Sequence, residues 1–200
     1  MRALFLAALI LSAAAIANTA AAKSLQTAIF AGGCFWCVEA DMDKIDGVVE
    51  TVSGFTGGRV KNPSYKQVVK GGTGHYEAVE ITYDADVLAY EDLVHRFLRS
   101  IDPLDGGGQF CDRGASYRSA IFAHSETQQR AAEASKQALE DSNRFTAPVV
   151  TEVLPAGEFY PAEGYHQNYY QENPLRYRFY RANCGRDARL EQLWGAEAEG

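Results

Sequence analysis

The chain has 200 residues, of which 46% are hydrophobic and 22% are charged. This composition is typical of a globular protein with one hydrophobic core and excludes an intrinsically disordered chain. The formal net charge of −7 argues against a nucleic-acid-binding protein, because such proteins gain affinity by neutralising phosphates with Lys and Arg. Four cysteines are too few for a disulfide-rich scaffold, but they suffice for two disulfides or for one redox pair.

The first 22 residues have the pattern of a secretory signal peptide. Arg2 precedes an apolar run over residues 3–17, and Ala20–Ala22 fits the small-residue pattern of a cleavage site. The run is short for a membrane span, although an uncleaved N-terminal anchor is the alternative. We expect residues 1–22 to be removed, leaving 23–200 as a single catalytic domain that is exported to the periplasm or secreted. In such an oxidising compartment disulfides persist.

Hydrophobic periodicity and turn residues predict alternating strands and helices in the rest of the chain. In order, we expect a strand over 27–31, a helix over 38–45, strands over 48–53 and 77–83, a helix over 90–100, a strand over 117–123, a helix over 126–142 and a strand over 149–154. Ser125 is expected to cap the last helix, with Gln128 at the capping-box position. Glycine-rich loops are expected at 54–74 and 105–114.

The order of these elements predicts an α+β fold. Two split βαβ units, as in ferredoxin-like proteins, would form a two-layer α/β sandwich. The tyrosine-rich stretch from 157 to 194 shows no clear period, so we expect a long irregular C-terminal segment. Because it is so aromatic, this segment should lie against the domain.

Cys34 lies where the first predicted strand turns into a helix. Two glycines before it allow a tight turn. The free N–H groups and the positive dipole end of a helix stabilise a thiolate. Phe35 and Trp36 follow directly and are expected to form an apolar wall. The pattern predicts that Cys34 is a nucleophile.

Cys37 follows Cys34 at the spacing that places two residues on one face of a helix. A Cys-x-x-Cys pair in an exported protein favours redox chemistry. One alternative is a structural disulfide between them, although so short a loop would add little stability. The other is a metal site, but zinc usually takes four ligands, and the sequence has no second Cys-x-x-Cys or paired His motif. We therefore expect no bound metal.

Six segments carry further recognisable motifs, in order along almost all of the chain after the signal. They are Gly33–Trp36, Ser53–Gly58, Asn62–Tyr65, Gly74–Val79, Asp112–Ser119 and Tyr160–Gln167. Together they resemble the peptide methionine sulfoxide reductases of the A type, which act on the S epimer of the sulfoxide. One such short motif is weak support for a family, whereas six in the same order are strong support.

The resemblance implies reduction of methionine sulfoxide, free or within proteins, to methionine. It implies that Cys34 attacks the sulfoxide and passes through a sulfenic acid. Glu77 would donate a proton, which requires a raised pKa in an apolar pocket. Tyr65 and Tyr117 would donate hydrogen bonds to the sulfoxide oxygen, and Asp112 would help to position the substrate or a water.

The same resemblance implies that Phe35 and Trp36 pack around the S-methyl group of the substrate. Structural roles stay open for several of these side chains, since a Glu at the start of a strand commonly faces solvent and tyrosines commonly pack in a core. His75 and His166 match positions of the family, but we assign them no chemistry.

The cysteines depart from the pattern of the family. In the family, Gly is common at the position of Cys37 and Asn is common at the position of Cys111. The C-terminal Gly-Tyr-Cys segment of the family is absent from this chain, and Cys184 lies further along the sequence. We expect Cys34 and Cys37 to form the redox pair, with Cys37 as the resolving cysteine and Cys111–Cys184 as a structural disulfide. The alternative resolving cysteine is Cys184, on a mobile tail.

The family resemblance also implies a thioredoxin-like reductant as partner. We expect no flavin, nicotinamide or other cofactor, because the glycine loops lack the dinucleotide and P-loop patterns. Two rival functions remain: a disulfide oxidoreductase that uses the Cys-x-x-Cys pair, and a non-catalytic secreted binding domain with two structural disulfides.

Overall fold

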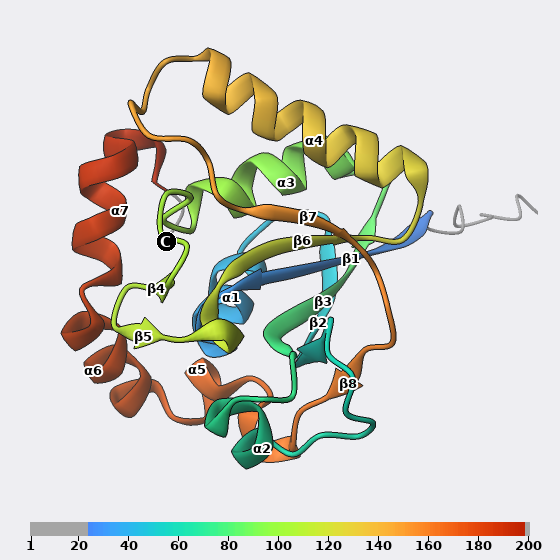
Figure 1. Ribbon diagram of the computed structural model, residues 1–200, viewed down its shortest axis with the longest axis vertical. Helices are drawn as coiled ribbons and strands as arrows, with labels where there is room; N and C mark the ends of the chain where they lie inside the picture. The colour runs from blue at the N-terminus through green and yellow to red at the C-terminus, as the bar shows by residue number, and fades with distance from the viewer. Residues whose placement is uncertain (1–23, 199–200) are drawn as a thin grey trace, which may run out of the picture.

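A computed structural model describes residues 24–198, so the predicted signal peptide lies outside the described residues (Figure 1). The elements in chain order are β1 Leu25–Gly32, α1 Phe35–Met42, β2 Val48–Thr56, α2 Tyr65–Lys70, β3 Tyr76–Asp84, α3 Tyr90–Arg99, β4 Gly108–Gln109, β5 Asp112–Arg113, β6 Ser119–Ala123, α4 Glu126–Asp141, β7 Glu152–Pro155, β8 Tyr160–Pro161, α5 Tyr169–Glu172, α6 Pro174–Cys184 and α7 Arg186–Trp194. Single turns of 3-10 helix span Ala115–Tyr117, Gly164–His166 and Gly195–Glu197.

The main sheet has six strands in the order β7-β6-β1-β3-β2-β8. The pairs β1–β3, β1–β6, β2–β3 and β2–β8 are antiparallel, and β6–β7 is parallel. Its centre, β6-β1-β3-β2, with α1 between β1 and β2 and α3 between β3 and β6, is the arrangement of two split βαβ units. The predicted α+β fold is confirmed.

The main hydrophobic core lies between the sheet and its helices. Along each strand successive side chains point to opposite faces, so Phe30, Val79 and Ile81 share the face that meets α1, α3 and α4. Phe30 stacks on Phe97 of α3, with ring centroids 4.5 Å apart. A smaller cluster, which includes Phe122, fills the opposite face beneath the segment between β7 and β8. The two layers therefore hold β1, β3 and α1, which carry the reactive residues, at the centre of the protein.

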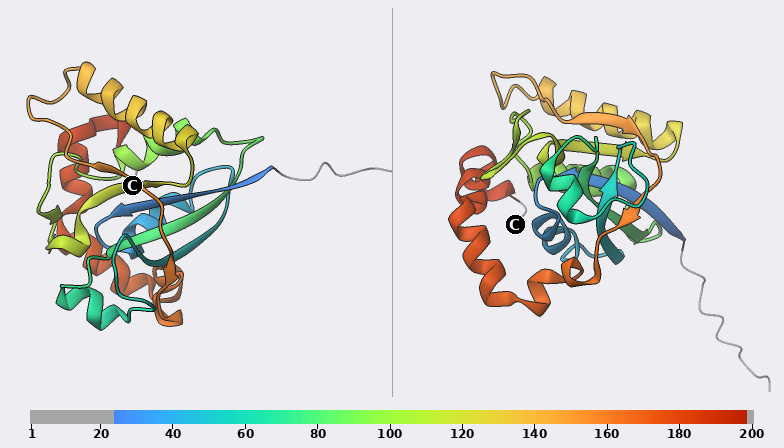
Figure 2. Two further views of the ribbon diagram at one scale, coloured as in Figure 1. Left: turned by 45° about the vertical axis from the view of Figure 1, so that its right-hand side comes forward. Right: turned by 60° about the horizontal axis from the view of Figure 1, so that its bottom comes forward.

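The C-terminal segment differs from its prediction, because it is mostly helical. It forms α5, α6 and α7, which pass around one end of the sheet (Figures 1 and 2). The inward side chains of α6 are Tyr177 and Arg181 rather than aliphatic residues, so the sequence lacks the apolar periodicity that marks an ordinary surface helix. Its aromatic residues also have weak intrinsic helix propensity.

Three smaller predictions are corrected as well. The two glycine-rich loops contain the short helix α2 and the β4–β5 hairpin. The side-chain oxygen of Ser125 accepts from the N–H of Gln128, as expected of a cap. The Gln128 side chain, however, does not return to Ser125. It accepts from the N–H of His124 and donates to the carbonyl of Thr27, and thereby connects α4 to β1.

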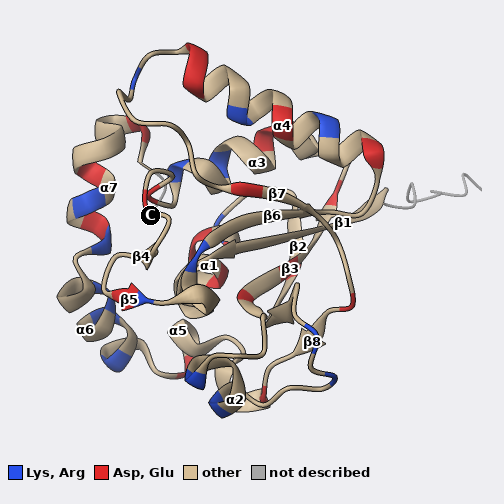
Figure 3. Cartoon of the chain, viewed as in Figure 1, with Lys and Arg blue, Asp and Glu red and all other residues tan. Residues whose placement is uncertain are grey.

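Charged residues lie mainly on the helices and loops, while the central strands are largely uncharged (Figure 3). The charged residues of α6 are all basic, namely Arg176, Arg178 and Arg181, as are Lys66 and Lys70 of α2. Within residues 24–198, no helix combines the length and the apolar character that crossing a bilayer would require.

Candidate active site

The predicted strand-to-helix turn at Cys34 is confirmed. β1 ends at Gly32, and Cys34 is the N-cap residue of α1. Gly33 between them has φ of +84°, and a Cβ there would lie 2.5 Å from the Cβ of Gln109. Only glycine fits this position, because both the backbone conformation and the space exclude a side chain. The turn places Cys34 at the base of a pocket formed by several loops.

Cys34 and Cys37 are both reduced and both buried, with 7% and 2% of their surface exposed. Burial raises the pKa of the Cys34 thiol well above its usual value, and its hydrogen bond with Cys37 and the charge of Glu77 add to this effect. The same hydrogen bond from Cys34 lowers the pKa of Cys37. These opposite shifts favour the proton on Cys34 over the proton on Cys37. This differs from the sequence-based expectation, because desolvation outweighs the helix N-terminus at Cys34.

Two buried guanidinium groups lie near Cys37, and their charges also lower its pKa. Arg181 of α6 binds Asp41 with an Nη1–Oδ1 distance of 2.7 Å. Arg186 of α7 lies 3.5 Å from the other oxygen of Asp41 and donates to the carbonyls of Gly32 and Ser100. The C-terminal helices thus supply buried positive charge beneath the thiol pair. Sequence reasoning missed this arrangement because it depends on helices that were not predicted.

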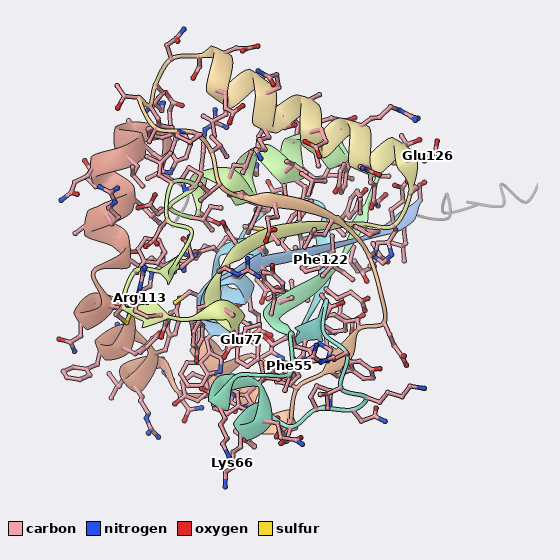
Figure 4. All side chains as sticks on the ribbon, viewed as in Figure 1. Phe55, Lys66, Glu77, Arg113, Phe122 and Glu126 are labelled. Atoms are coloured by element: carbon pink, nitrogen blue, oxygen red, sulfur yellow. A yellow bond between two sulfur atoms is a disulfide. The ribbon has the colours of Figure 1, made fainter. Side chains whose placement is uncertain are left out.

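Glu77 is buried, with 1% of its surface exposed. It shares its face of β3 with Val79 and Ile81, so its carboxyl group points toward the start of α1, where Oε2 accepts from the N–H of Phe35 at 3.2 Å. Burial raises its pKa to about 8, against the lowering effect of that hydrogen bond. Figure 4 shows Glu77 in the interior, near Phe55. The expected protonated carboxyl is therefore present, and the solvent-facing alternative is wrong.

The remaining polar residues predicted for the site come from three separate loops. Tyr65 is the first residue of α2, Asp112 lies in β5, and Tyr117 ends a turn of 3-10 helix. Burial raises the pKa of Tyr65 to about 12, with a further contribution from the charge of Glu77, and burial raises that of Tyr117. Both hydroxyls therefore keep their protons at neutral pH and serve as donors.

These residues surround one small cavity of about 50 Å³. Its lining consists of Cys34, Phe35, Trp36, Tyr65, Glu77, Asp112, Tyr117 and Tyr180. All the residues predicted for catalysis and substrate binding are thus brought together, and Tyr180 of α6 joins them. The cavity is far below the ~300–1,000 Å³ of a typical small-molecule site, so it suits the end of one side chain.

Aromatic residues hold Trp36 at the mouth of this cavity. Tyr169 of α5 stacks on Trp36 with ring centroids 3.8 Å apart, and the indole N–H donates to Nδ1 of His166 at 3.1 Å. His166 also packs on Tyr65, with ring centroids 4.4 Å apart. His166 thus has a positioning role. Tyr169 was missed because it lies in the segment predicted to be irregular.

The other two cysteines form a disulfide. Cys111 lies in the β4–β5 hairpin and Cys184 is the last residue of α6; their Cα atoms are 4.9 Å apart. The predicted pairing of Cys111 with Cys184 is present. In this state Cys184 ends a helix and is bonded to Cys111, which differs from the free, mobile position that the alternative assumed.

Comparison with known proteins identifies the family. The family model for peptide methionine sulfoxide reductase matches residues 26–198. The chain belongs to this family. The Bacillus subtilis peptide methionine sulfoxide reductase MsrA is 51% identical over 172 residues, which cover 86% of this chain and 97% of that protein. The Caulobacter vibrioides protein MsrA 2 is 50% identical over 182 residues, covering 90% and 91% of the two chains.

Solved structures of the family have the same fold. Methionine sulfoxide reductase A of Corynebacterium diphtheriae superimposes with a TM-score of 0.69 at 34% identity, covering 78% of each chain. Mxr1 of Saccharomyces cerevisiae in its reduced form gives a TM-score of 0.71 at 30% identity and covers 75% of this chain and 86% of its own. The family resemblance drawn from the six motifs is confirmed.

Proposed function

We propose that this protein reduces methionine-S-sulfoxide, free or in peptides and proteins, to methionine. The observation that carries the proposal is the reduced Cys34, with Cys37 three residues further along α1, in the lining of a small aromatic cavity beside the buried Glu77, whose pKa is raised to about 8. Membership of the peptide methionine sulfoxide reductase family supports it.

The first step is attack of Cys34 on the sulfoxide sulfur. The Cys34 proton passes along the hydrogen bond to Cys37, and the Cys34 sulfur forms a bond to the sulfoxide. Glu77 donates its proton to the sulfoxide oxygen, while Tyr65 and Tyr117 donate hydrogen bonds to it. Transfer of this hydroxyl to Cys34 breaks the sulfur–oxygen bond of the substrate and the bond between the substrate sulfur and Cys34. It leaves a sulfenic acid at Cys34, methionine, and an ionised Glu77.

The second step forms a disulfide between Cys34 and Cys37. The Cys37 sulfur attacks the sulfenic acid, and its proton leaves with the hydroxyl as water. The two sulfurs are already within hydrogen-bonding reach across one turn of α1, so this step needs little movement. Cys184 would first have to leave Cys111, which makes Cys37 the better resolving cysteine.

The cavity supports the choice of a thioether-sized substrate. Phe35 and Trp36 offer an apolar surface to the S-methyl group, whereas Asp112 helps to position the substrate or a water. Because one wall of the cavity is apolar and the other carries hydroxyl groups, the oxygen and the methyl group of only one epimer would both be placed correctly. The family resemblance identifies this epimer as S.

A thioredoxin-like dithiol protein completes the cycle by reducing the Cys34–Cys37 disulfide. We further propose that residues 1–22 direct export and are removed, so that the protein works in the periplasm or outside the cell. The Cys111–Cys184 disulfide fits an oxidising compartment. The intact mass of the protein recovered from the periplasmic fraction tests this; a mass beginning at Met1 would contradict cleavage.

The function is tested with the two epimers of a methionine sulfoxide peptide and dithiothreitol as reductant. We expect the S epimer alone to be lost, and chromatography measures this loss. If neither epimer is reduced by the folded protein, the proposed function is wrong, and reduction of a model protein disulfide would then be measured for the rival oxidoreductase.

Replacing the resolving cysteine should separate the two steps. In Cys37→Ser we expect one equivalent of methionine per protein without reductant, with a sulfenic acid that stays trapped at Cys34, because no neighbouring thiol attacks it. Chromatography measures the methionine, and intact mass with a sulfenic acid probe measures the sulfenic acid at Cys34. Rapid disulfide formation at Cys34 in this variant would assign resolution to another cysteine.

A further inference from the structure

Tyr180 enters the active site from the C-terminal helix α6, outside every motif that carries the family resemblance. Its side chain lines the same cavity as Cys34, Glu77 and Asp112. Its ring meets Trp36 edge to face, with centroids 5.7 Å apart at 79°. Its hydroxyl donates a short hydrogen bond to Oδ2 of Asp112. The partly buried hydroxyl of Tyr180 thus lies among the polar residues of the cavity.

We propose that Tyr180 is a further catalytic residue, whose hydroxyl connects the Asp112 carboxyl group to the Cys34 sulfur and stabilises the Cys34 thiolate. The proposal rests on the proposed role of Cys34 as nucleophile. It adds a donor that acts on the attacking sulfur, separate from the donors that act on the sulfoxide oxygen.

The chemistry follows from the single proton of a phenol. Tyr180 lies within hydrogen-bonding reach of both Asp112 and Cys34, but it has one O–H to donate. With the Cys34 thiol protonated, that O–H goes to the Asp112 carboxylate. When Cys34 loses its proton, the negative sulfur becomes the competing acceptor. Hydrogen bonds to an ionised group are about twice as strong as neutral ones.

Burial of Asp112 favours the transfer of the Tyr180 hydrogen bond from Asp112 to the Cys34 sulfur, since burial raises the pKa of the Asp112 carboxyl group above its usual value. A carboxyl group with a raised pKa is less readily ionised and competes less strongly with the sulfur for the Tyr180 O–H. Burial also raises the pKa of Tyr180, so its hydroxyl does not ionise in the process. The result is a hydrogen-bonded chain from Asp112 through Tyr180 to Cys34.

The Cys111–Cys184 disulfide holds Asp112 and Tyr180, the first two members of this chain, together. Cys111 directly precedes Asp112, and Cys184 lies one helical turn after Tyr180. The Cys184 sulfur is 3.8 Å from Oδ2 of Asp112 and 4.0 Å from the Tyr180 hydroxyl oxygen. The disulfide therefore fixes the β4–β5 hairpin against α6 at the point where the two residues meet.

The test measures the ionisation of Cys34 directly. The ionisable groups that face the site are Cys37, Tyr65, Glu77, Asp112, Tyr117 and Tyr180, with Arg181 and Arg186 beneath Cys37. The rate of alkylation of Cys34 by iodoacetamide is followed against pH by intact mass, in the full chain carrying Cys37→Ser so that one free thiol reacts.

Adding Tyr180→Phe should raise the pH midpoint of Cys34 alkylation by about one unit and lower the rate at pH 7 about tenfold. The phenyl ring keeps the contact with Trp36, so the fold should be retained. The matched control is Tyr170→Phe, which removes a hydroxyl that donates to Asp43 at 2.9 Å, outside the cavity. We expect the control to leave the midpoint unchanged.

A second variant weakens the contact between Tyr180 and Asp112 without altering either residue. Cys111→Ser with Cys184→Ser should shift the midpoint in the same direction, by less. Unchanged midpoints in the Tyr180 variant, or equal shifts in the Tyr170 control, overturn the proposal. Alkylation needs no sulfoxide, so a wild-type protein that reduces neither epimer would refute the proposed function while leaving this measurement valid.

Discussion

Cys34→Ser should abolish reduction of methionine sulfoxide, leaving less than about a thousandth of the wild-type rate. A serine hydroxyl is not ionised at neutral pH and forms no sulfenic acid, so both chemical steps are lost. The measurement is single-turnover loss of the S epimer at saturating protein. The fold should survive, because oxygen is smaller than sulfur and the side chain is a helix N-cap, a position that serine favours.

The matched control is Cys37→Ser, which makes the same atomic change one helical turn further along α1. We expect it to complete the first turnover, at a lower rate because Cys37 no longer accepts the Cys34 proton, and to lose the disulfide. The two variants should have similar thermal stability, measured by circular dichroism. Residual first-turnover activity above a tenth in Cys34→Ser would assign the nucleophile elsewhere.

The sequence predicted the parts of the site that depend on local pattern. The two glycines before Cys34 define the turn, and the predicted strand over 77–83 carries Glu77, although only the family resemblance implied that its carboxyl group is buried. The order of strands and helices predicted the split βαβ arrangement that brings β1 and β3 together. Such features rely on periods of two or 3.6 residues, which one sequence displays directly.

The contribution of the C-terminal helices could not be predicted in the same way. Tyr180, Arg181 and Arg186 act through contacts with β5, α1 and the end of β1, more than 60 residues away in the chain. A helix that presents Tyr177 and Arg181 inward has no apolar stripe. The one signal in the sequence was Cys184, since a disulfide to Cys111 would bring α6 to the hairpin that carries Asp112.

The pKa shifts of the two cysteines also depend on tertiary structure that the local sequence pattern does not show. The position of Cys34 at a helix N-terminus predicted a stabilised thiolate, but burial raises the pKa of Cys34, and the lowered pKa belongs to Cys37. Burial of a particular side chain is a tertiary property, because it depends on which loops close over it.

Glu77→Gln should lower the single-turnover rate at pH 7 by about 100-fold or more, the usual loss when a general acid is removed. The amide keeps the shape and can retain an oxygen facing the Phe35 N–H, but it has no acidic proton for the sulfoxide oxygen. In the wild type the rate should fall as pH rises through about 8, where the carboxyl that must be protonated ionises. This falling limb should be missing in the variant.

The control for this substitution is Glu39→Gln in α1. Glu39 is also fully buried, and burial raises its pKa to about 7, but its Oε1 accepts from the N–H of Asn168 outside the cavity. We expect Glu39→Gln to keep both the rate and the falling limb near pH 8. A limb that survives in Glu77→Gln and disappears in Glu39→Gln would transfer the proton-donor role to Glu39. Equal rates in the Glu77 variant and the wild type would show that the sulfoxide oxygen takes its proton from another donor, with the tyrosine hydroxyls of the cavity next in line, because they remain protonated across this range.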